Sequence, residues 1–84
     1  MIRQVTPVYP AMARNARISG PVRLKVVVGG DGTVEDVRYV SGHVLLAKAA
    51  MDAVRQWVYK PTLLNGQPVA VVTEVEVNFT LGDQ

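Results

Sequence analysis

The sequence predicts a small α+β domain, with two helices packed on one face of a three-stranded antiparallel sheet, in the chain order α-β-β-α-β. Three segments alternate apolar and polar residues with the two-residue period of strands that are buried on one face. A glycine-rich turn joins the first two segments, as in a hairpin. Two stretches of helix-forming residues complete the pattern. A chain of 84 residues that is 49% apolar suits one domain of this kind.

Composition argues against several classes of function. The net charge is +2 and the nine Lys and Arg residues are dispersed, whereas a nucleic-acid partner favours clustered basic residues. The apolar runs are too short to cross a membrane, and Arg3 is not followed by the apolar stretch of a signal peptide. We therefore expect either a cytosolic protein or a piece of a longer chain. The chain has no cysteine, which excludes disulfides and cysteine-ligated metals.

The chain begins with an N-terminal arm, residues 1–8, which shows no periodicity. The domain proper is predicted to span residues 9–81, and residues 82–84 form a short tail. Pro10 suits the first turn of a helix, because its missing N–H has no partner there. A short helix is predicted over residues 11–17, and Ser19, Gly20 and Pro21 are expected to end it.

A β-hairpin is predicted next, with strands over residues 22–28 and 33–40 and a turn at residues 29–32. In the second strand Val34 is out of phase with Val37 and Tyr39, so we expect a β-bulge near Glu35 and Asp36. The Gly-rich turn joins two strands. It therefore lacks the helix N-terminus that phosphate-binding loops use.

The second helix is predicted over residues 44–59, with Ser41 as its N-cap. Its apolar residues recur at helical spacing and form one stripe, which we expect to pack on the sheet. The stripe consists of Leu46, Ala49, Ala50, Ala53, Val54 and Trp57. Residues 63–68 are interpreted as a turn segment.

The last strand is predicted to run over residues 68–81 without interruption, which at about 3.3 Å per residue is roughly 45 Å. The side chains predicted to face inward are Val69, Val71, Val75, Val77, Phe79 and Leu81. Polar residues on the other side require a solvated face, which favours an antiparallel place beside the first strand and the sheet order 2-1-3. A parallel place beside the second strand is the alternative. The helices would cover a face made of Val22, Leu24, Val26, Val37, Tyr39, Val71, Val75, Val77 and Phe79.

Residues for catalysis are lacking. The chain has a single histidine, His43, which is interpreted as a helix cap or a surface residue. The aspartates lie on different elements without metal-ligand spacing. Glu74 and Glu76 share an exposed row, whereas acid–base catalysis requires a carboxylate with a perturbed pKa. We therefore predict no catalytic residue, no metal, no cofactor and no small-molecule substrate, and place the site on the exposed surface.

A set of short motifs nevertheless resembles a known family. The motifs are Pro7-x-Tyr9-Pro10, Ile18-Ser19-Gly20-x-Val22, Asp31-Gly32-x-Val34, Val40-Ser41-Gly42, Ala49-Ala50, Ala53-Val54-Arg55-Gln56-Trp57, Pro61 and Asn65-Gly66-x-Pro68-Val69. Together, in this order, they resemble the C-terminal domain of the TonB family of energy transducers over residues 7–81. The resemblance implies a non-enzymatic, periplasmic domain of a protein anchored in the inner membrane. In that family the domain passes force, derived from the proton motive force by inner-membrane motor proteins, to outer-membrane receptors for nutrient uptake.

The resemblance also implies where a partner binds. Members of the family bind an extended receptor segment, the box, at a sheet edge by strand addition. Here this implies the last strand, with help from the arm. The implied binding residues are Val69, Val71, Val72, Thr73, Val75, Val77 and Phe79, together with Thr6, Pro7, Tyr9 and Pro10. Thr6 stands where the family carries Gln. A homodimer formed through the same edge, and an accessory or sensing domain of another membrane protein, are the alternatives.

Overall fold

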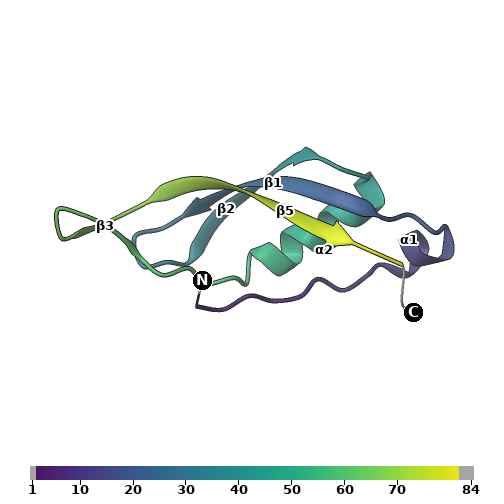
Figure 1. The fold of residues 1–84 in the computed structure, drawn as a ribbon, viewed down its shortest axis with the longest axis horizontal. Coiled ribbons are helices and arrows are strands. Elements are labelled where there is room, and N and C mark those ends of the chain that lie inside the picture. Colours follow the sequence, from purple (N-terminus) through teal and green to yellow (C-terminus); the bar gives the residue numbers. More distant parts are fainter. Residues whose placement is uncertain (1, 82–84) are drawn as a thin grey trace.

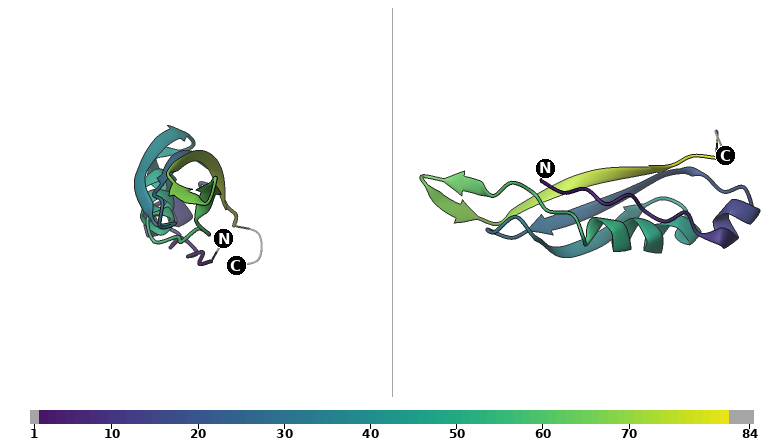
Figure 2. Two further views of the ribbon diagram at one scale, coloured as in Figure 1. Left: turned by 90° about the vertical axis from the view of Figure 1, so that its left-hand side faces the viewer. Right: turned by 90° about the horizontal axis from the view of Figure 1, so that it is seen from below.

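The computed structural model describes residues 2–81 and shows a twisted sheet with one long helix lying across it (Figure 1). Strands β1 (Gly20–Val28), β2 (Val34–Ser41) and β5 (Val71–Phe79) form an antiparallel sheet in the order β2-β1-β5. The predicted order 2-1-3 is thereby confirmed, and the parallel alternative is wrong. Helix α2 (Val44–Val54) packs against β1 and β2, and the short helix α1 (Ala11–Asn15) contacts α2 at one end of the sheet (Figures 1 and 2). The predicted tail, residues 82–84, lies outside the described residues.

The core lies between α2 and the sheet. Its larger members are Val22, Leu24, Val26, Val37, Leu46, Val54, Trp57, Val77 and Phe79. Tyr39 is the exception to the predicted face, because its side chain is 46% exposed. It lies on β2, one of the two outer strands of the sheet, where its hydroxyl donates a hydrogen bond to the carbonyl of Gly42.

The predicted β-bulge is confirmed. Val27 lies opposite Asp36 and Val28 opposite Val34, so Glu35 is the extra residue of β2. The bulge restores the inward phase of Val37, which is buried. In the preceding turn, the Asp31 carboxylate accepts hydrogen bonds from the hydroxyl and the backbone N–H of Thr33. These bonds hold the pKa of Asp31 below its ordinary value of 3.8.

The start of α2 differs from the prediction. Ser41 is the last residue of β2, and His43 is the N-cap instead. The Nδ1 atom of His43 accepts a hydrogen bond from the N–H of Leu45 at 3.1 Å, which satisfies one of the free donors of the first turn. The capping interpretation of His43 is thereby confirmed.

The end of α2 also differs, because the helix stops at Val54 and not at residue 59. Trp57 is buried as predicted, but it lies beyond the helix, directly after a turn at residues 55–56. The backbone of Val58 exchanges hydrogen bonds with Arg3, and the N–H of Tyr59 donates to the Gly32 carbonyl. These long-range partners replace the helical hydrogen bonds that the apolar stripe favours.

Helix α1 likewise ends earlier than predicted. It covers Ala11–Asn15, and Arg17 adopts a positive φ of 57°. The N–H of Ile18 then donates to the carbonyl of Ala13, which closes the helix end. Arg17, in a left-handed conformation, therefore ends the helix, a role that was expected of Gly20.

The predicted continuous strand over residues 68–81 is wrong. Residues 63–68, interpreted as a turn, belong to a hairpin of β3 (Thr62–Leu64) and β4 (Gln67–Val69), and Ala70 separates β4 from β5. Asn65 and Gly66 have φ angles of 53° and 78°, as a two-residue type I′ hairpin turn requires. This hairpin projects beyond the sheet, and the molecule is 49 Å long (Figure 1). Both leucines of β3 are more than 60% exposed.

A pair of tyrosines provides a test of the packing. The hydroxyl of Tyr59 is buried without a hydrogen-bond partner among the described protein atoms, and burial raises its pKa. We expect Tyr59→Phe to leave the free energy of unfolding unchanged or to raise it by up to about 1 kcal/mol, because the phenyl ring has no polar group to desolvate. Tyr9→Phe is the matched control: its hydroxyl donates to the carbonyl of Ile18, so its loss should cost about 1 kcal/mol. Urea unfolding of both variants checks this, and a larger loss for Tyr59→Phe would contradict it.

Candidate strand-binding edge

Strand β5 has one paired edge and one open edge. Its pairing with β1 runs without interruption from Val71 opposite Val28 to Phe79 opposite Gly20. Among the described residues no strand pairs with the other edge of β5, which we call the free edge. The backbone N–H and C=O groups along such an edge are available to a further strand.

The N-terminal arm lies close to β5 and is held by hydrogen bonds at Ile2, Arg3 and Val5, and by the packing of Tyr9, the residue that follows it. The N–H groups of Ile2 and Arg3 donate to the Val58 carbonyl, and the indole Nε1 of Trp57 donates to the Val5 carbonyl at 2.9 Å. The rings of Tyr9 and Phe79 meet edge to face, with 5.4 Å between their centroids. The Arg14 guanidinium lies 5.3 Å from the centroid of the Tyr9 ring, within the range of a cation–π contact. These contacts hold the arm against the rest of the fold.

A pocket of about 210 Å³, which we call the edge pocket, lies between the arm and β5. Its lining residues are Gln4, Val5, Thr6, Pro7, Trp57, Glu76, Val77 and Asn78. The hydrogen bond between Trp57 and Val5 fixes the arm side of this pocket, and β5 provides the other side. An extended segment beside the C-terminal half of β5 would therefore lie between two backbones.

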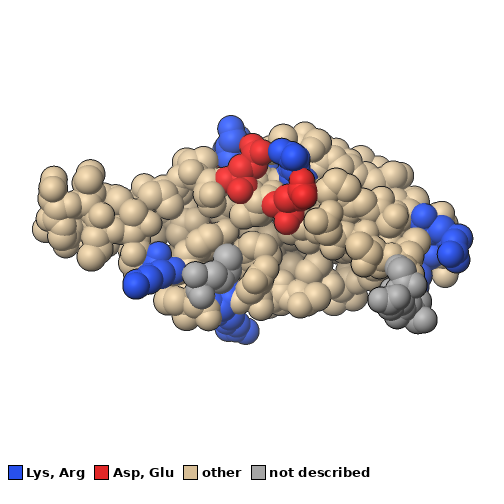
Figure 3. Space-filling view, viewed as in Figure 1, with Lys and Arg blue, Asp and Glu red and all other residues tan. Residues whose placement is uncertain are grey.

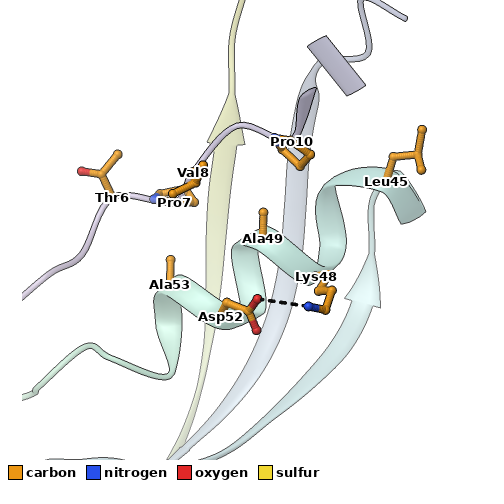
Figure 4. Close-up of a pocket in the computed structure, with 9 residues that line it drawn as sticks. All are labelled: Thr6, Pro7, Val8, Pro10, Leu45, Lys48, Ala49, Asp52 and Ala53. Atoms are coloured by element: carbon orange, nitrogen blue, oxygen red, sulfur yellow. Dashed lines mark ion pairs between the residues drawn. The ribbon is translucent and has the colours of Figure 1, made fainter. Parts of the chain in front are cut away.

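A second hollow, which we call the helix groove, lies on the other side of the arm. It has a volume of about 350 Å³ and is bounded by residues 6–8 of the arm, by Pro10 and by α2 (Figure 4). On the helix side it is lined by Ala49 and Ala53. Lys48 and Asp52 also line it and form an ion pair, with 3.7 Å between Nζ and Oδ2. None of its lining residues belongs to β5.

The outward face of the sheet is charged near the free edge. Glu74 and Glu76 lie on this face, opposite Lys25 and Arg23 of β1. The Arg23 guanidinium lies 3.6 Å from a Glu74 carboxylate oxygen and 3.2 Å from one of Glu76. Figure 3 shows acidic and basic side chains meeting over the region that β1 and β5 occupy in Figure 1.

The structure brings most of the predicted site residues together. Val71, Val72, Thr73, Val75, Val77 and Phe79 all lie on β5. Thr6 and Pro7 line both hollows, Tyr9 contacts Phe79, and Pro10 lines the helix groove only. Val69 is separated from the others, because it lies in β4 and pairs with Thr62 of the projecting hairpin.

The edge pocket also contains residues that the sequence did not indicate. Gln4 and Val5 come from a segment without periodicity, and Trp57 was assigned to the core alone. Glu76 and Asn78 were assigned to the solvated face, and their position on β5 next to the arm has no local signal in the sequence. Contacts between residues 52 positions apart, such as Val5 and Trp57, require the folded chain.

Neither a metal centre nor a membrane span is present in the part of the chain that the structure describes. No three His, Asp or Glu side chains within residues 2–81 converge as metal ligands. The longest helix there, α2, has 11 residues, and none of the described helices meets the length and hydropathy needed to cross a bilayer.

These features define the class of the domain, an α+β module that presents a bare strand edge beside a structured arm. The chain belongs to the TonB C-terminal family: the family model described as "Gram-negative bacterial TonB protein C-terminal" matches residues 5–81. The chain is 40% identical over 77 residues to the Protein TonB of Xanthomonas campestris and 32% identical over 80 residues to that of Vibrio cholerae. These alignments cover 89% and 93% of the chain.

The similarity is confined to part of each relative. The chain spans 34% of the Xanthomonas protein and 33% of the Vibrio protein, about a third of each. Its fold matches the solution NMR structure of the Pseudomonas aeruginosa TonB CTD with a TM-score of 0.80, covering 99% of this chain and 86% of that one. The sequence identity in that comparison is 24%, so it bears on the fold alone.

Proposed function

We propose that this domain binds the extended box segment of outer-membrane receptors by strand addition to the free edge of β5. The observation that carries the proposal is a nine-residue strand with one edge that no strand pairs with within residues 2–81, beside a pocket that the arm lines on one side. An added strand gains main-chain hydrogen bonds, which place few demands on its sequence. A module that serves several receptors needs this tolerance.

The proposal extends to the protein of which this domain is one part. The domain acts in the periplasm, joined to an inner-membrane anchor, and passes force derived from the proton motive force to the receptor for nutrient uptake. Inner-membrane motor proteins supply that force through the segment that precedes the domain. The role of the domain is mechanical and non-enzymatic. Hydrogen bonds arranged along a strand are loaded together when the chains are pulled in shear, which suits a contact that bears force.

The test uses backbone methylation of the ligand, because it leaves the protein untouched. A synthetic peptide that carries the box of a Gram-negative outer-membrane receptor is methylated at alternate backbone nitrogens, in two versions offset by one residue. Successive N–H groups of a strand point to opposite sides. We therefore expect one version to lose binding by at least about tenfold and the other to retain it, as measured by isothermal titration calorimetry. Equal retention by both versions would contradict strand addition.

A homodimer is the second candidate, because the same free edge can pair with a second copy. The apolar side chain of Val72, which lies on β5, is 63% exposed and favours self-association. Light scattering over a hundredfold range of protein concentration separates the two candidates. A monomer throughout favours the receptor segment, whereas a dimer that excess box peptide fails to dissociate favours self-pairing.

A further inference from the structure

The helix groove is an elongated hollow of about 350 Å³ with mainly apolar walls. On the helix side, Leu45 and Ala53 lie about 12 Å apart along the axis of α2, at about 1.5 Å per residue. The methyl groups of Ala49 and Ala53 point towards the arm, where Pro7 and Val8 form the opposite wall (Figure 4). A concave site of this size with apolar walls is typical of a binding site for a small molecule.

The groove stays open because the arm is not fastened to α2. The hydrogen bonds described for residues 2–9 lead to Val58, Trp57 and Ile18, all of which lie outside α2. The alanines at positions 49 and 53 have the smallest side chains that carry a Cβ, so the helix leaves space below the arm. The hollow is therefore bounded by backbone that other contacts already hold in place.

One cation at the groove is available to an anionic ligand. The Lys48 side chain is 89% exposed, and its Nζ lies 3.7 Å from Oδ2 of Asp52. Asp52 has a closer partner, because its Oδ1 lies 3.1 Å from Nη1 of Arg55. Asp52 is also the only acidic residue that lines the groove, and the arm adds none, since residues 1–30 contain no Asp or Glu. The charge at the groove therefore favours an anion.

We infer that the helix groove binds a linear amphiphile that consists of an acyl chain and a carboxylate head. The acyl chain lies along Ala49 and Ala53, where it removes apolar surface from water. The carboxylate pairs with the ammonium of Lys48, while Asp52 keeps its bond to Arg55. The ligand is bound and not converted. No residue of β5 lines this groove, so the inference does not rest on the proposed function.

The experiment follows the amide shifts of the labelled domain by NMR at pH 7, where a carboxylic acid is ionised. The three probes are octanoate, octylammonium and acetate. We expect octanoate to give saturable shifts at Thr6, at Val8 and along residues 45–53. Octylammonium should bind about fivefold more weakly, because an exposed pair of charges changes an affinity by roughly two- to fivefold. Acetate lacks the chain and should give no saturable shifts.

The preference for the carboxylate is assigned by a matched pair of variants. Lys48→Gln should reduce the ratio of octanoate to octylammonium affinities to less than about twofold. The control Lys60→Gln makes the same change of net charge outside the groove and should keep the fivefold ratio. Both side chains are exposed, so both variants should fold, with thermal unfolding as the check.

A second pair of variants assigns the site of the chain. Ala49→Phe fills the groove and should abolish binding of octanoate, whereas Ala70→Phe adds the same ring outside the groove and should leave it unchanged. If Ala49→Phe fails to fold, Val8→Glu replaces it, because the Val8 side chain is 80% exposed. A carboxylate at this wall should weaken octanoate by about fivefold and spare octylammonium.

Three results would overturn the inference, each for a different reason. Equal binding of octanoate and octylammonium would show that the groove accepts any apolar chain. Saturable binding of acetate at Lys48 would show that only the charge is recognised. Octanoate binding that survives both Ala49→Phe and Val8→Glu would place the ligand outside the helix groove.

Discussion

Trp57→Ala is expected to lower the free energy of unfolding by about 3–5 kcal/mol, the usual cost of removing a buried tryptophan side chain. Trp57 is 5% exposed, belongs to the core cluster and packs beside Tyr59 with 6.4 Å between the ring centroids. Small domains are marginally stable. We therefore expect the variant to be largely unfolded at 37 °C, with circular dichroism as the measurement.

The variant Trp57→Phe separates packing from the hydrogen bond to the arm. Phenylalanine keeps most of the apolar bulk but cannot donate to the Val5 carbonyl, as the indole Nε1 does. We expect a folded domain that has lost about 1–2 kcal/mol, with a loosened arm and weaker binding of the box peptide. Trp57→Phe with unchanged peptide affinity would show that the arm side of the edge pocket does not contribute to binding.

Gly32→Ala is expected to cost at least about 2 kcal/mol, because both space and backbone conformation exclude a side chain there. Gly32 has a φ angle of 88°, and a Cβ atom would lie 2.0 Å from the carbonyl oxygen of Tyr59. The same two residues are joined by the hydrogen bond from the Tyr59 N–H to the Gly32 carbonyl. A side chain at Gly32 therefore pushes away the segment that holds the N-terminal arm.

Gly66→Ala provides the matched control for the backbone effect alone. Gly66 has a similar φ angle of 78°, but no atom lies within 4 Å of the position that a Cβ would take. Its substitution should cost about 1 kcal/mol, the price of the left-handed conformation without a clash. Chemical denaturation of both variants measures the difference. An equal loss in the two variants would contradict the close approach of Tyr59 to Gly32.

The sheet was predictable from the sequence because its signals are local. Alternation in residues 22–28 and 71–79, the Gly-rich turn and the phase break at Glu35 each depend on neighbouring residues, and all are present in the structure. The order of the strands followed from the need for one solvated face. The burial of Trp57 followed from its place in the apolar stripe.

Errors occurred where distant partners decide the conformation. The stripe of α2 continues to Trp57 in the sequence, but Val58 pairs with Arg3 and Thr33, which ends the helix early. The strand is interrupted at Ala70 because Val69 pairs with Thr62 of β3. The alternation of apolar and polar residues in the sequence continues through Ala70 and gives no sign of this interruption. Asn65 and Gly66 were a recognisable hairpin signal, which the interpretation as a simple turn did not use.

The candidate site was predictable in part. The family resemblance implied the last strand, and the structure shows that this strand has an unpaired edge among the described residues. The arm contributes to the edge pocket through backbone atoms, such as the Val5 carbonyl. The role of a backbone atom cannot be predicted from the pattern of side chains. Glu76 and Asn78 gain their place in the edge pocket only because the arm folds back beside β5.

The free edge of β5 is where we propose that the partner binds. The most direct measurement is an amide-resolved NMR titration of the domain with the box peptide. We expect the largest shifts along Val71–Phe79, together with slower hydrogen exchange at those amides whose N–H groups point to the free edge. Shifts confined to the turn at residues 29–32 or to the helix groove, with β5 unchanged, would contradict the account.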